Sequence, residues 1–216
     1  PYYGYGLAEC DVGAFLQGQR AAFTVATKVG LYPWGAAACH ATSVWARKAL
    51  GKLVPIVSLP VISWQVDRAR LSLQQSLKRL KTDYVDCLFL HEPDENLINA
   101  DEFMRWMESE LARGTLRSWG LAGVADKVAP WVRAGHPLAR VIQTQDSLDK
   151  RQADFLLDSG RALQFTYGYL SSQSQPDQAN TPEMILRKAL ERNATGAVIV
   201  STRRADRMVQ LARLAA

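Results

Sequence analysis

The stretch SLKRLKTDYVDCLFLHEPD, residues 76–94, decides the fold because a helix gives way to a buried strand within it. Its first part ends a helical pattern expected over residues 66–80, with Leu73, Leu77 and Leu80 on one face. The run VDCLFLH (85–91) follows, and its nearly continuous apolar character is typical of a parallel strand buried on both faces. A helix followed so closely by such a strand indicates an α/β fold.

The same alternation continues on both sides of this stretch. Further strands are expected at 23–29, 118–124, 140–145, 163–169 and 197–200, and further helices at 101–113, 127–134, 151–157, from 181 onward and at 206–214. Six strands can make an open doubly wound sheet or six eighths of a (β/α)8 barrel. Periodicity alone leaves both architectures open.

Composition narrows the class of protein. The chain has 216 residues, of which 48% are hydrophobic and 22% charged, as in ordinary globular proteins. No apolar run is long enough for a membrane span, and the first residues do not resemble a signal peptide. Cys10, Cys39 and Cys87 offer no CxxC pair, so we expect neither a disulfide framework nor a zinc site, and a reducing cytoplasm as the location.

The net charge of +5 allows anionic ligands, including nucleic acid or phosphate-bearing cofactors. No segment carries five or six like charges in a row, however, so a solvated surface with a mild basic excess is the preferred interpretation. We therefore expect no nucleic acid partner.

Polar side chains stand where several expected strands end, namely Lys28, His91, Gln143 and Tyr167. In parallel α/β folds these strand ends face the active site. A lysine within an apolar strand is costly unless it is paired or functional, whereas a lone histidine is more often structural. A lysine could lower the pKa of a tyrosine, and a neutral imidazole could orient a carbonyl, so together they favour proton transfer to a carbonyl oxygen.

Several motifs together resemble the aldo-keto reductase family. Residues 76–94 are similar to its signature, a helix ending in SLxRL and a strand ending in LLHxPD. PYYGYGLAE resembles the stretch DTAxxYGxGxSE, which places the family's tyrosine at Tyr3 and its glutamate at Glu9. VATKVG, SWGLAGV, VIQTQ and TYGYL resemble STKVG, xxGVSN, the strand with the cofactor-contacting glutamine, and AYSPL. The order and approximate spacing hold along the whole chain.

The resemblance implies a single (β/α)8 barrel domain over residues 1–216, with the first two strands upstream of Pro1. It implies an NAD(P)H-dependent oxidoreductase acting on a small carbonyl or alcohol, with Tyr3 as general acid, Lys28 lowering its pKa and His91 orienting the carbonyl. Gln143 and Tyr167 would hold the nicotinamide. Ser201, Thr202 and Arg207 would bind the phosphate, with NADP favoured over NAD, and no metal is implied.

The spacing from Lys28 to His91 suits the bacterial sugar- and pyridoxal-dehydrogenase-like branch of the family, which has an extended loop after the lysine strand. In this chain that loop carries Tyr32, Trp34 and Trp64, which could line a substrate pocket or simply pack against the barrel. Packing is the preferred interpretation.

Three departures from the pattern open an alternative. The family's catalytic aspartate would lie upstream of Pro1, the usual Ser-Asn pair is Ala122-Gly123, and the loop after Tyr169 is short and polar. A nicotinamide-binding sensor or regulatory subunit with impaired catalysis is therefore the second hypothesis. The sequence does not indicate an oligomeric state.

Overall fold

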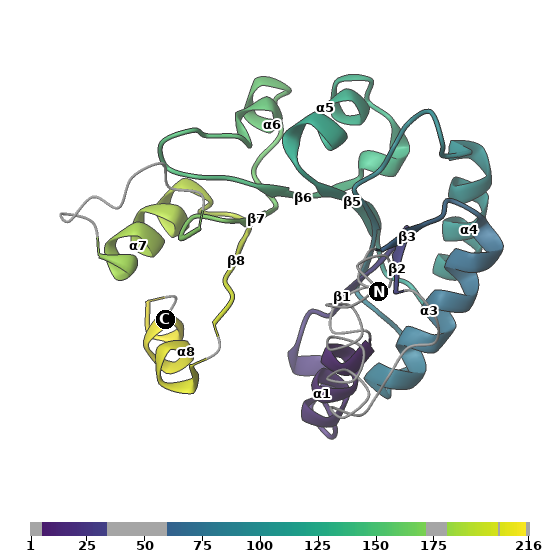
Figure 1. The fold of residues 1–216 in the computed structure, drawn as a ribbon, viewed down its shortest axis with the longest axis horizontal. Helices are drawn as coiled ribbons and strands as arrows, with labels where there is room; N and C mark the ends of the chain where they lie inside the picture. The colour runs from purple at the N-terminus through teal and green to yellow at the C-terminus, as the bar shows by residue number, and fades with distance from the viewer. Residues whose placement is uncertain (1–5, 34–59, 172–180, 203, 215–216) are drawn as a thin grey trace, which may run out of the picture. The chain divides into compact units, whose positions relative to one another are not determined.

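The computed structural model describes residues 6–33, 60–171, 181–202 and 204–214. Its main sheet has six strands in the order β1-β4-β5-β6-β7-β8, which is also their order along the chain (Figure 1). The chain divides into two compact units, Pro1–Leu121 and Ala122–Ala216. Each unit is described by itself below.

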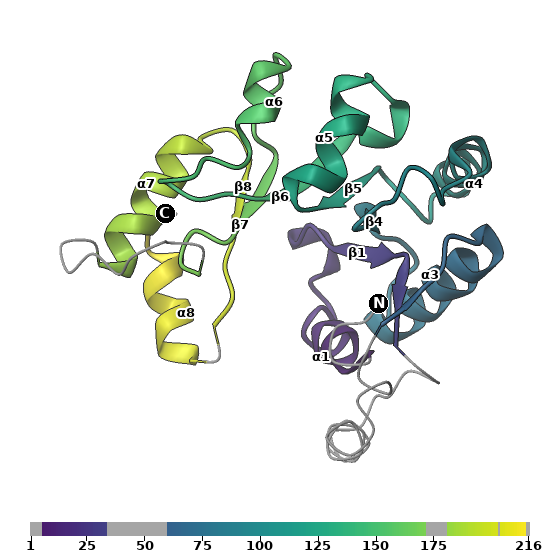
Figure 2. The ribbon, with the colours of Figure 1, turned by 45° about the horizontal axis from the view of Figure 1, so that its top comes forward.

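Unit 1 is built on two parallel strands with helices around them. Strand β1 (Ala26–Val29) pairs with β4 (Cys87–His91), and the amide of Leu88 donates to the carbonyl of Ser118, next to β5 (Trp119–Gly123). Figure 2 shows α1 (Leu7–Phe15) beside α3 (Val66–Leu80), and the two helices are in contact. The last helix of this unit is α4 (Ala100–Ala112).

The local sequence explains these elements. Strand β4 is buried up to its last residue, His91, as its continuous apolar run requires, and Leu88, Phe89 and Leu90 have no exposed surface. Helix α4 begins where the Asn99 side chain accepts a hydrogen bond from the amide of Glu102 at 3.2 Å, an N-cap.

Unit 2 repeats the alternation of helix and strand. Strands β6, β7 and β8 are parallel neighbours in that order. The buried core between β7, β8 and α7 is formed by Tyr169, Ile185 and Ala189. The elements of this unit are α5 (Ala125–Arg133), β6 (Val141–Gln145), α6 (Asp154–Asp158), β7 (Phe165–Tyr167), α7 (Pro182–Arg192), β8 (Ala197–Ile199) and α8 (Ala205–Ala212).

The structure confirms the six predicted strands and adds elements that the sequence patterns did not predict. Helix α1 was not expected from the glycine-aromatic character of the N-terminal stretch. A short antiparallel pair, β2 (Leu31–Tyr32) with β3 (Val61–Ile62), and two 3-10 turns, Arg20–Ala22 and Pro137–Ala139, also appear. Among the described residues, no helix has the length and apolar character that a membrane crossing needs.

Candidate active site

Lys28 lies on β1, and a buried ion pair holds the neighbouring residue in place. The Thr27 hydroxyl donates to Glu9 at 2.6 Å, and the Arg79 guanidinium contacts the other oxygen of the same carboxylate at 2.7 Å. Glu9 comes from α1 and Arg79 from the SLKRL end of α3. This contact joins two of the sequence motifs and ties both helices to the lysine strand.

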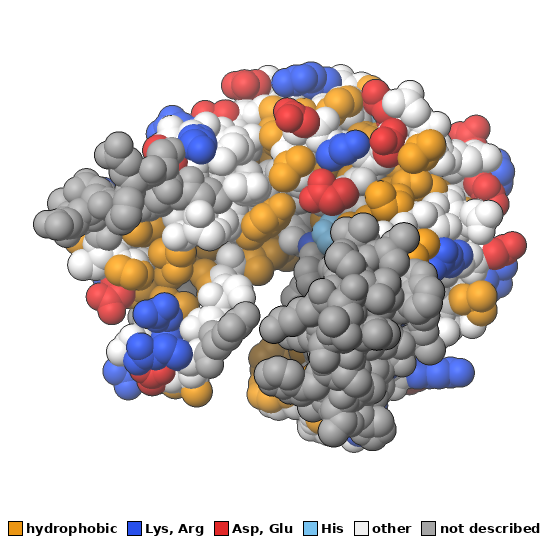
Figure 3. Space-filling model, viewed as in Figure 1, with side chains coloured by type: hydrophobic (Ala, Val, Ile, Leu, Met, Phe, Trp, Pro, Cys, Tyr) orange, Lys and Arg blue, Asp and Glu red, His pale blue; other side chains and the backbone are white. Residues whose placement is uncertain are grey.

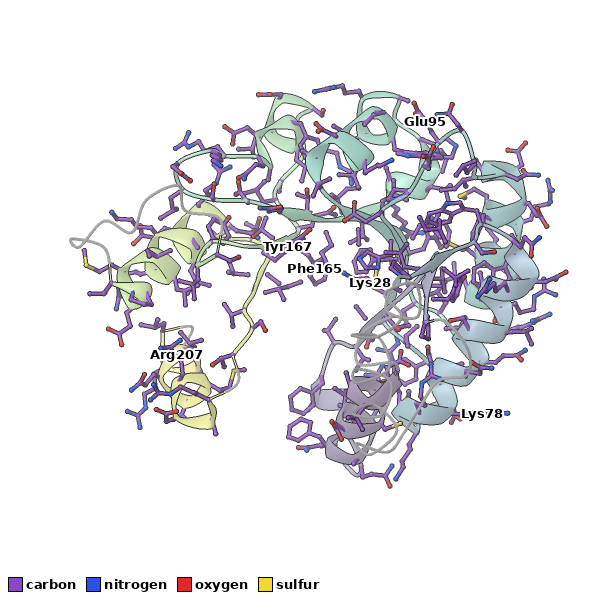
Figure 4. All side chains as sticks on the ribbon, in the orientation of Figure 1. Lys28, Lys78, Glu95, Phe165, Tyr167 and Arg207 are labelled. Carbon is purple, nitrogen blue, oxygen red and sulfur yellow. The ribbon has the colours of Figure 1, made fainter. Side chains whose placement is uncertain are left out.

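The strand register places Lys28 and His91 on one face of the sheet. The Cα of Lys28 is paired with that of Phe89, and His91 follows two residues later on β4. Since alternate residues of a strand point to the same face, Lys28, Phe89 and His91 share it. Both polar side chains are half-buried, and Figure 4 labels Lys28 on β1. The structure therefore brings two of the predicted site residues together.

Burial shifts both titratable groups. Loss of hydration lowers the pKa of Lys28 to about 8, although the nearby carboxylate of Glu92 acts in the opposite direction. Loss of hydration, and then the positive charge of Lys28, lower the pKa of His91 to about 4. At neutral pH the imidazole is therefore neutral and most of the Lys28 population carries its proton. A neutral donor beside a cation can polarise a carbonyl without adding a second charge.

A second pair of predicted residues shares a face in unit 2. Gln143 is paired with Phe165 and Gln145 with Tyr167 along the parallel strands β6 and β7. All four side chains therefore point to the same side of these strands. Phe165 and Tyr167 are labelled together on β7 in Figure 4. Two amides beside two aromatic rings form a surface on which a flat polar ring can stack and be hydrogen-bonded.

A buried ionic network just after β6 was missed by the sequence interpretation. Asp146 has no exposed surface and accepts hydrogen bonds from the Tyr169 hydroxyl at 2.7 Å and from Arg192 at 2.7 Å. Burial, together with the Asp146 carboxylate, raises the pKa of Tyr169 to about 12. An acidic residue directly after a strand end was the one available signal, but its arginine partner lies 46 positions away.

The predicted phosphate-binding residues lie around the start of α8. The helix begins at Ala205, and the Thr202 hydroxyl accepts a hydrogen bond from the amide of Arg204 at 3.1 Å. Ser201 and Arg207 are exposed, and Figure 4 labels Arg207 on α8. Figure 3 shows basic side chains gathered at this helix with an acidic one among them, and Arg204 and Asp206 form an ion pair there. The helix start and the basic side chain of Arg207 can attract an anion, although the Asp206 carboxylate already accepts hydrogen bonds from backbone amides of the first turn.

Other predicted features have mixed outcomes. Tyr3 and Trp34 lie outside the described residues. Tyr32 and Trp64 are buried, and the Trp64 ring meets Phe103 edge-on at 6.4 Å, as the packing interpretation predicted. Ala122 and Gly123 are both buried at the end of β5.

The cysteines require one correction. Cys10 is disulfide-bonded, whereas we predicted no disulfide framework. Cys87 is a free, buried thiol on β4, and loss of hydration is the main reason why its pKa rises to about 12. In the part of the chain that the structure describes, no cluster of His, Cys, Asp or Glu could hold a metal ion.

Comparison with known proteins decides the family. The model of the aldo/keto reductase family matches residues 1–153, well over half of the chain. This chain belongs to the aldo/keto reductase family. It is 26% identical over 147 residues to the methylglyoxal reductase DkgB of Salmonella typhi, a match that covers 62% of this chain and 51% of that protein. The chain thus spans about half the length of the curated relative it matches.

Solved structures of the family share the fold. The aldo-keto reductase AKR11C1 from Bacillus halodurans, in its holo form, is 20% identical with a TM-score of 0.73, covering 99% of this chain and 74% of that one. An aldo/keto reductase from Klebsiella pneumoniae, in complex with NADP and acetate, is 17% identical with a TM-score of 0.61, covering 97% and 70%. These likenesses confirm the predicted (β/α)8 barrel class, of which this chain contributes six parallel strands.

Proposed function

We propose that the protein is an NAD(P)H-dependent oxidoreductase that interconverts an aldehyde or ketone and the corresponding alcohol. The observation that carries the proposal is the placement of Lys28 and His91 on one face of β1 and β4, with a neutral imidazole beside an ammonium. Membership of the family and the methylglyoxal reductase named among the relatives support the same reaction class.

Each residue has a defined role in the proposal. Tyr3 delivers a proton to the carbonyl oxygen in the reducing direction and takes it back in the oxidising direction. A free phenol, with a pKa of about 10, gives up its proton poorly at neutral pH, and the ammonium of Lys28 favours the phenolate and so eases the transfer. His91 donates a hydrogen bond to the same oxygen and orients it.

The residues present in unit 2 fit a nicotinamide cofactor. The rings and amides on the shared face of β6 and β7 suit a planar carboxamide-bearing ring, with Tyr167 stacking and Gln143 donating and accepting hydrogen bonds. When bound, the cofactor supplies or accepts a hydride. Ser201, Thr202 and Arg207 would hold its adenosine phosphate, and a guanidinium at Arg207 favours NADP over NAD by pairing with the additional phosphate.

The test is turnover with a matched control. The chain should oxidise NADPH in the presence of a panel of aldehydes that includes methylglyoxal, and Tyr3→Phe should lower kcat by about 10²- to 10⁴-fold because the general acid is lost. Tyr84→Phe is the control, since Tyr84 lies before β4 with its ring between Arg20 and Arg117, each 4.0 Å from the ring centre. Activity that survives Tyr3→Phe would sink the assignment of the acid.

One observation favours a second candidate function. Ala122 and Gly123 are buried where the family resemblance expects a serine and an asparagine, so two side-chain hydrogen bonds to the carboxamide are missing. A nicotinamide-binding sensor or regulatory subunit would tolerate that loss. NADPH that quenches protein fluorescence without any turnover of the aldehyde panel would favour this candidate.

Several wider expectations stay proposals. The single barrel domain over residues 1–216, the cytoplasmic location and the bacterial sugar- and pyridoxal-dehydrogenase-like branch rest on the resemblance. The partner proposed is a small carbonyl or alcohol and not a nucleic acid. Steeply salt-dependent DNA binding would contradict that choice, because phosphate contacts release counterions.

A further inference from the structure

We propose that Asp146, Tyr169 and Arg192 act as a clamp that positions the ring of Tyr167. These three residues, hereafter the Asp146 clamp, are positioning residues for the nicotinamide site, and the inference rests on the proposed function. All of them lie in unit 2, where Asp146 and Tyr169 come just after the strands β6 and β7 that carry candidate cofactor residues and Arg192 ends α7.

The clamp holds the chain at Tyr167 and just after it. The amide of Asp146 donates to the carbonyl oxygen of Tyr167 at 2.8 Å. Two residues further along, the hydroxyl of Tyr169 donates to the Asp146 carboxylate at 2.7 Å. Between them Gly168 has a φ of 102°, a left-handed conformation that glycine adopts without strain. One aspartate therefore fixes the backbone at Tyr167 and the turn that follows it.

The carboxylate is itself held by charge. Arg192, at the end of α7, donates from Nε to Oδ2 of Asp146 at 2.7 Å and from Nη2 to Oδ1 at 3.3 Å. The same guanidinium donates to Asp154 at 2.6 Å. The amide of Ala153 donates a fourth hydrogen bond to the buried Asp146 carboxylate, at 3.2 Å. A buried charge with this many partners is compensated and has little rotational freedom.

The Tyr169 ring anchors the clamp to the core. It is almost completely buried and packs with Ile185 and Ala189 of α7. The hydroxyl and the ring thus have separable roles, because the ring packs against the helix while the hydroxyl closes the hydrogen bond to Asp146. Removing only the hydroxyl tests the clamp without opening a cavity.

This arrangement matters because stacking depends on ring orientation. Tyr167 is half-buried, so part of its side chain is open to a ligand that could stack on the ring. A side chain that binds a ligand needs a supporting shell to keep it within a fraction of an ångström of its productive position. The Asp146 clamp supplies that shell through the backbone at Tyr167 and the turn that follows it.

The test compares two hydroxyl deletions in the chain. Tyr169→Phe should raise the Kd for NADPH, measured by quenching of protein fluorescence, by about tenfold, equivalent to about 1.4 kcal/mol. Thr115→Val is the matched control, because the Thr115 hydroxyl donates to the buried carboxylate of Glu110 at 2.6 Å in unit 1, which carries none of the residues proposed to hold the nicotinamide. Thr115→Val should lower the melting temperature by about as much as Tyr169→Phe does. It should leave the Kd for NADPH within twofold of that of the unsubstituted chain.

A second measurement separates the clamp from the proposed function. Hydrogen exchange of the peptide covering residues 165–171 should speed up in Tyr169→Phe and stay unchanged in Thr115→Val. If the chain binds no NADPH, the proposed function fails, and faster exchange alone still supports the clamp. Unchanged exchange, or a Kd that moves no more than in the control, overturns the clamp.

Discussion

His91 is the residue whose environment makes the sharpest prediction. Loss of hydration and the charge of Lys28 lower its pKa from 6.5 to about 4. Between these two values the unfolded chain binds a proton that the folded chain does not, so the free energy of unfolding falls as the pH drops from 6.5 towards 4. Urea unfolding at several pH values should show this loss, and His91→Gln should remove its share of the slope. If the free energy of unfolding depended on pH equally in His91→Gln, the lowered pKa of His91 would be contradicted.

Lys28 provides an independent check on the same pair. Lys28→Met removes a positive charge and keeps an apolar chain of similar length, so the pKa of His91 should rise by about one unit. Burial still acts, so the pKa should remain below 6.5. Titration of the imidazole proton signals by NMR measures the shift directly. A His91 pKa that does not move would mean that the two groups do not interact.

Residues of this kind differ in how far a sequence predicts them. Lys28 and His91 stand out because charged or titratable side chains interrupt apolar strands, and parallel strands place their ends at one edge. The pairing of Asp146 with Arg192 leaves no such mark, because the two residues are 46 positions apart and meet only when the end of α7 reaches the turn after β6. Tyr32 and Trp64 were open to two interpretations, and only their burial decides for packing.

The close contact between α1 and α3 should make the stability of the protein sensitive to any side chain at Gly13. Gly13 on α1 lies against the end of α3 so closely that an added Cβ would stand 2.2 Å from the carbonyl oxygen of Arg79. Gly13→Ala should therefore destabilise the protein by about 1–3 kcal/mol despite the higher helix propensity of alanine, because backbone must move. The exposed Asp11→Ala on the same helix is the control. If the Gly13→Ala variant were more stable than the unsubstituted protein, α1 would not pack on α3.

The buried ion pair of Glu9 and Arg79 should contribute strongly to the stability of the protein. Arg79→Met leaves the Glu9 carboxylate buried without its cation and should cost about 3–5 kcal/mol in urea unfolding. Adding Glu9→Gln should recover part of that loss, because a neutral amide can still accept the hydrogen bond from Thr27. Equal stability of the single and double variants would contradict a coupled pair.

Elements were predicted best where a periodic pattern was long. The helix expected over 66–80 is α3, Val66–Leu80, because its leucines repeat on one face. Helix α1 was missed because glycines and aromatics mask its start, and it follows Gly6 in a left-handed conformation without a side-chain cap. The pair β2 and β3 was missed because its strands are two residues long and 28 residues apart, too short for a period to appear.

The order of strands in the sheet follows the order in the sequence, which is the simplest outcome of repeated βα units. Alternation alone could not choose between an open sheet and a barrel, because the two differ in which strands meet, a contact between residues far apart in the chain. Sequence motifs of the family made that choice, and the fold of its solved members agrees with it.

The net charge of the whole molecule should govern how its solubility depends on pH. With a net charge of +5 and a pI of about 9.2, the chain should be least soluble near pH 9, where self-repulsion is weakest. Arg70→Glu together with Lys188→Glu, both on exposed helix positions, lowers the formal charge by two at each site, from +5 to +1, and should move the minimum towards neutral pH. Precipitation by polyethylene glycol across pH 6–10 measures it. A minimum that stays near pH 9 in the variant would show that a local surface, and not net charge, governs self-association.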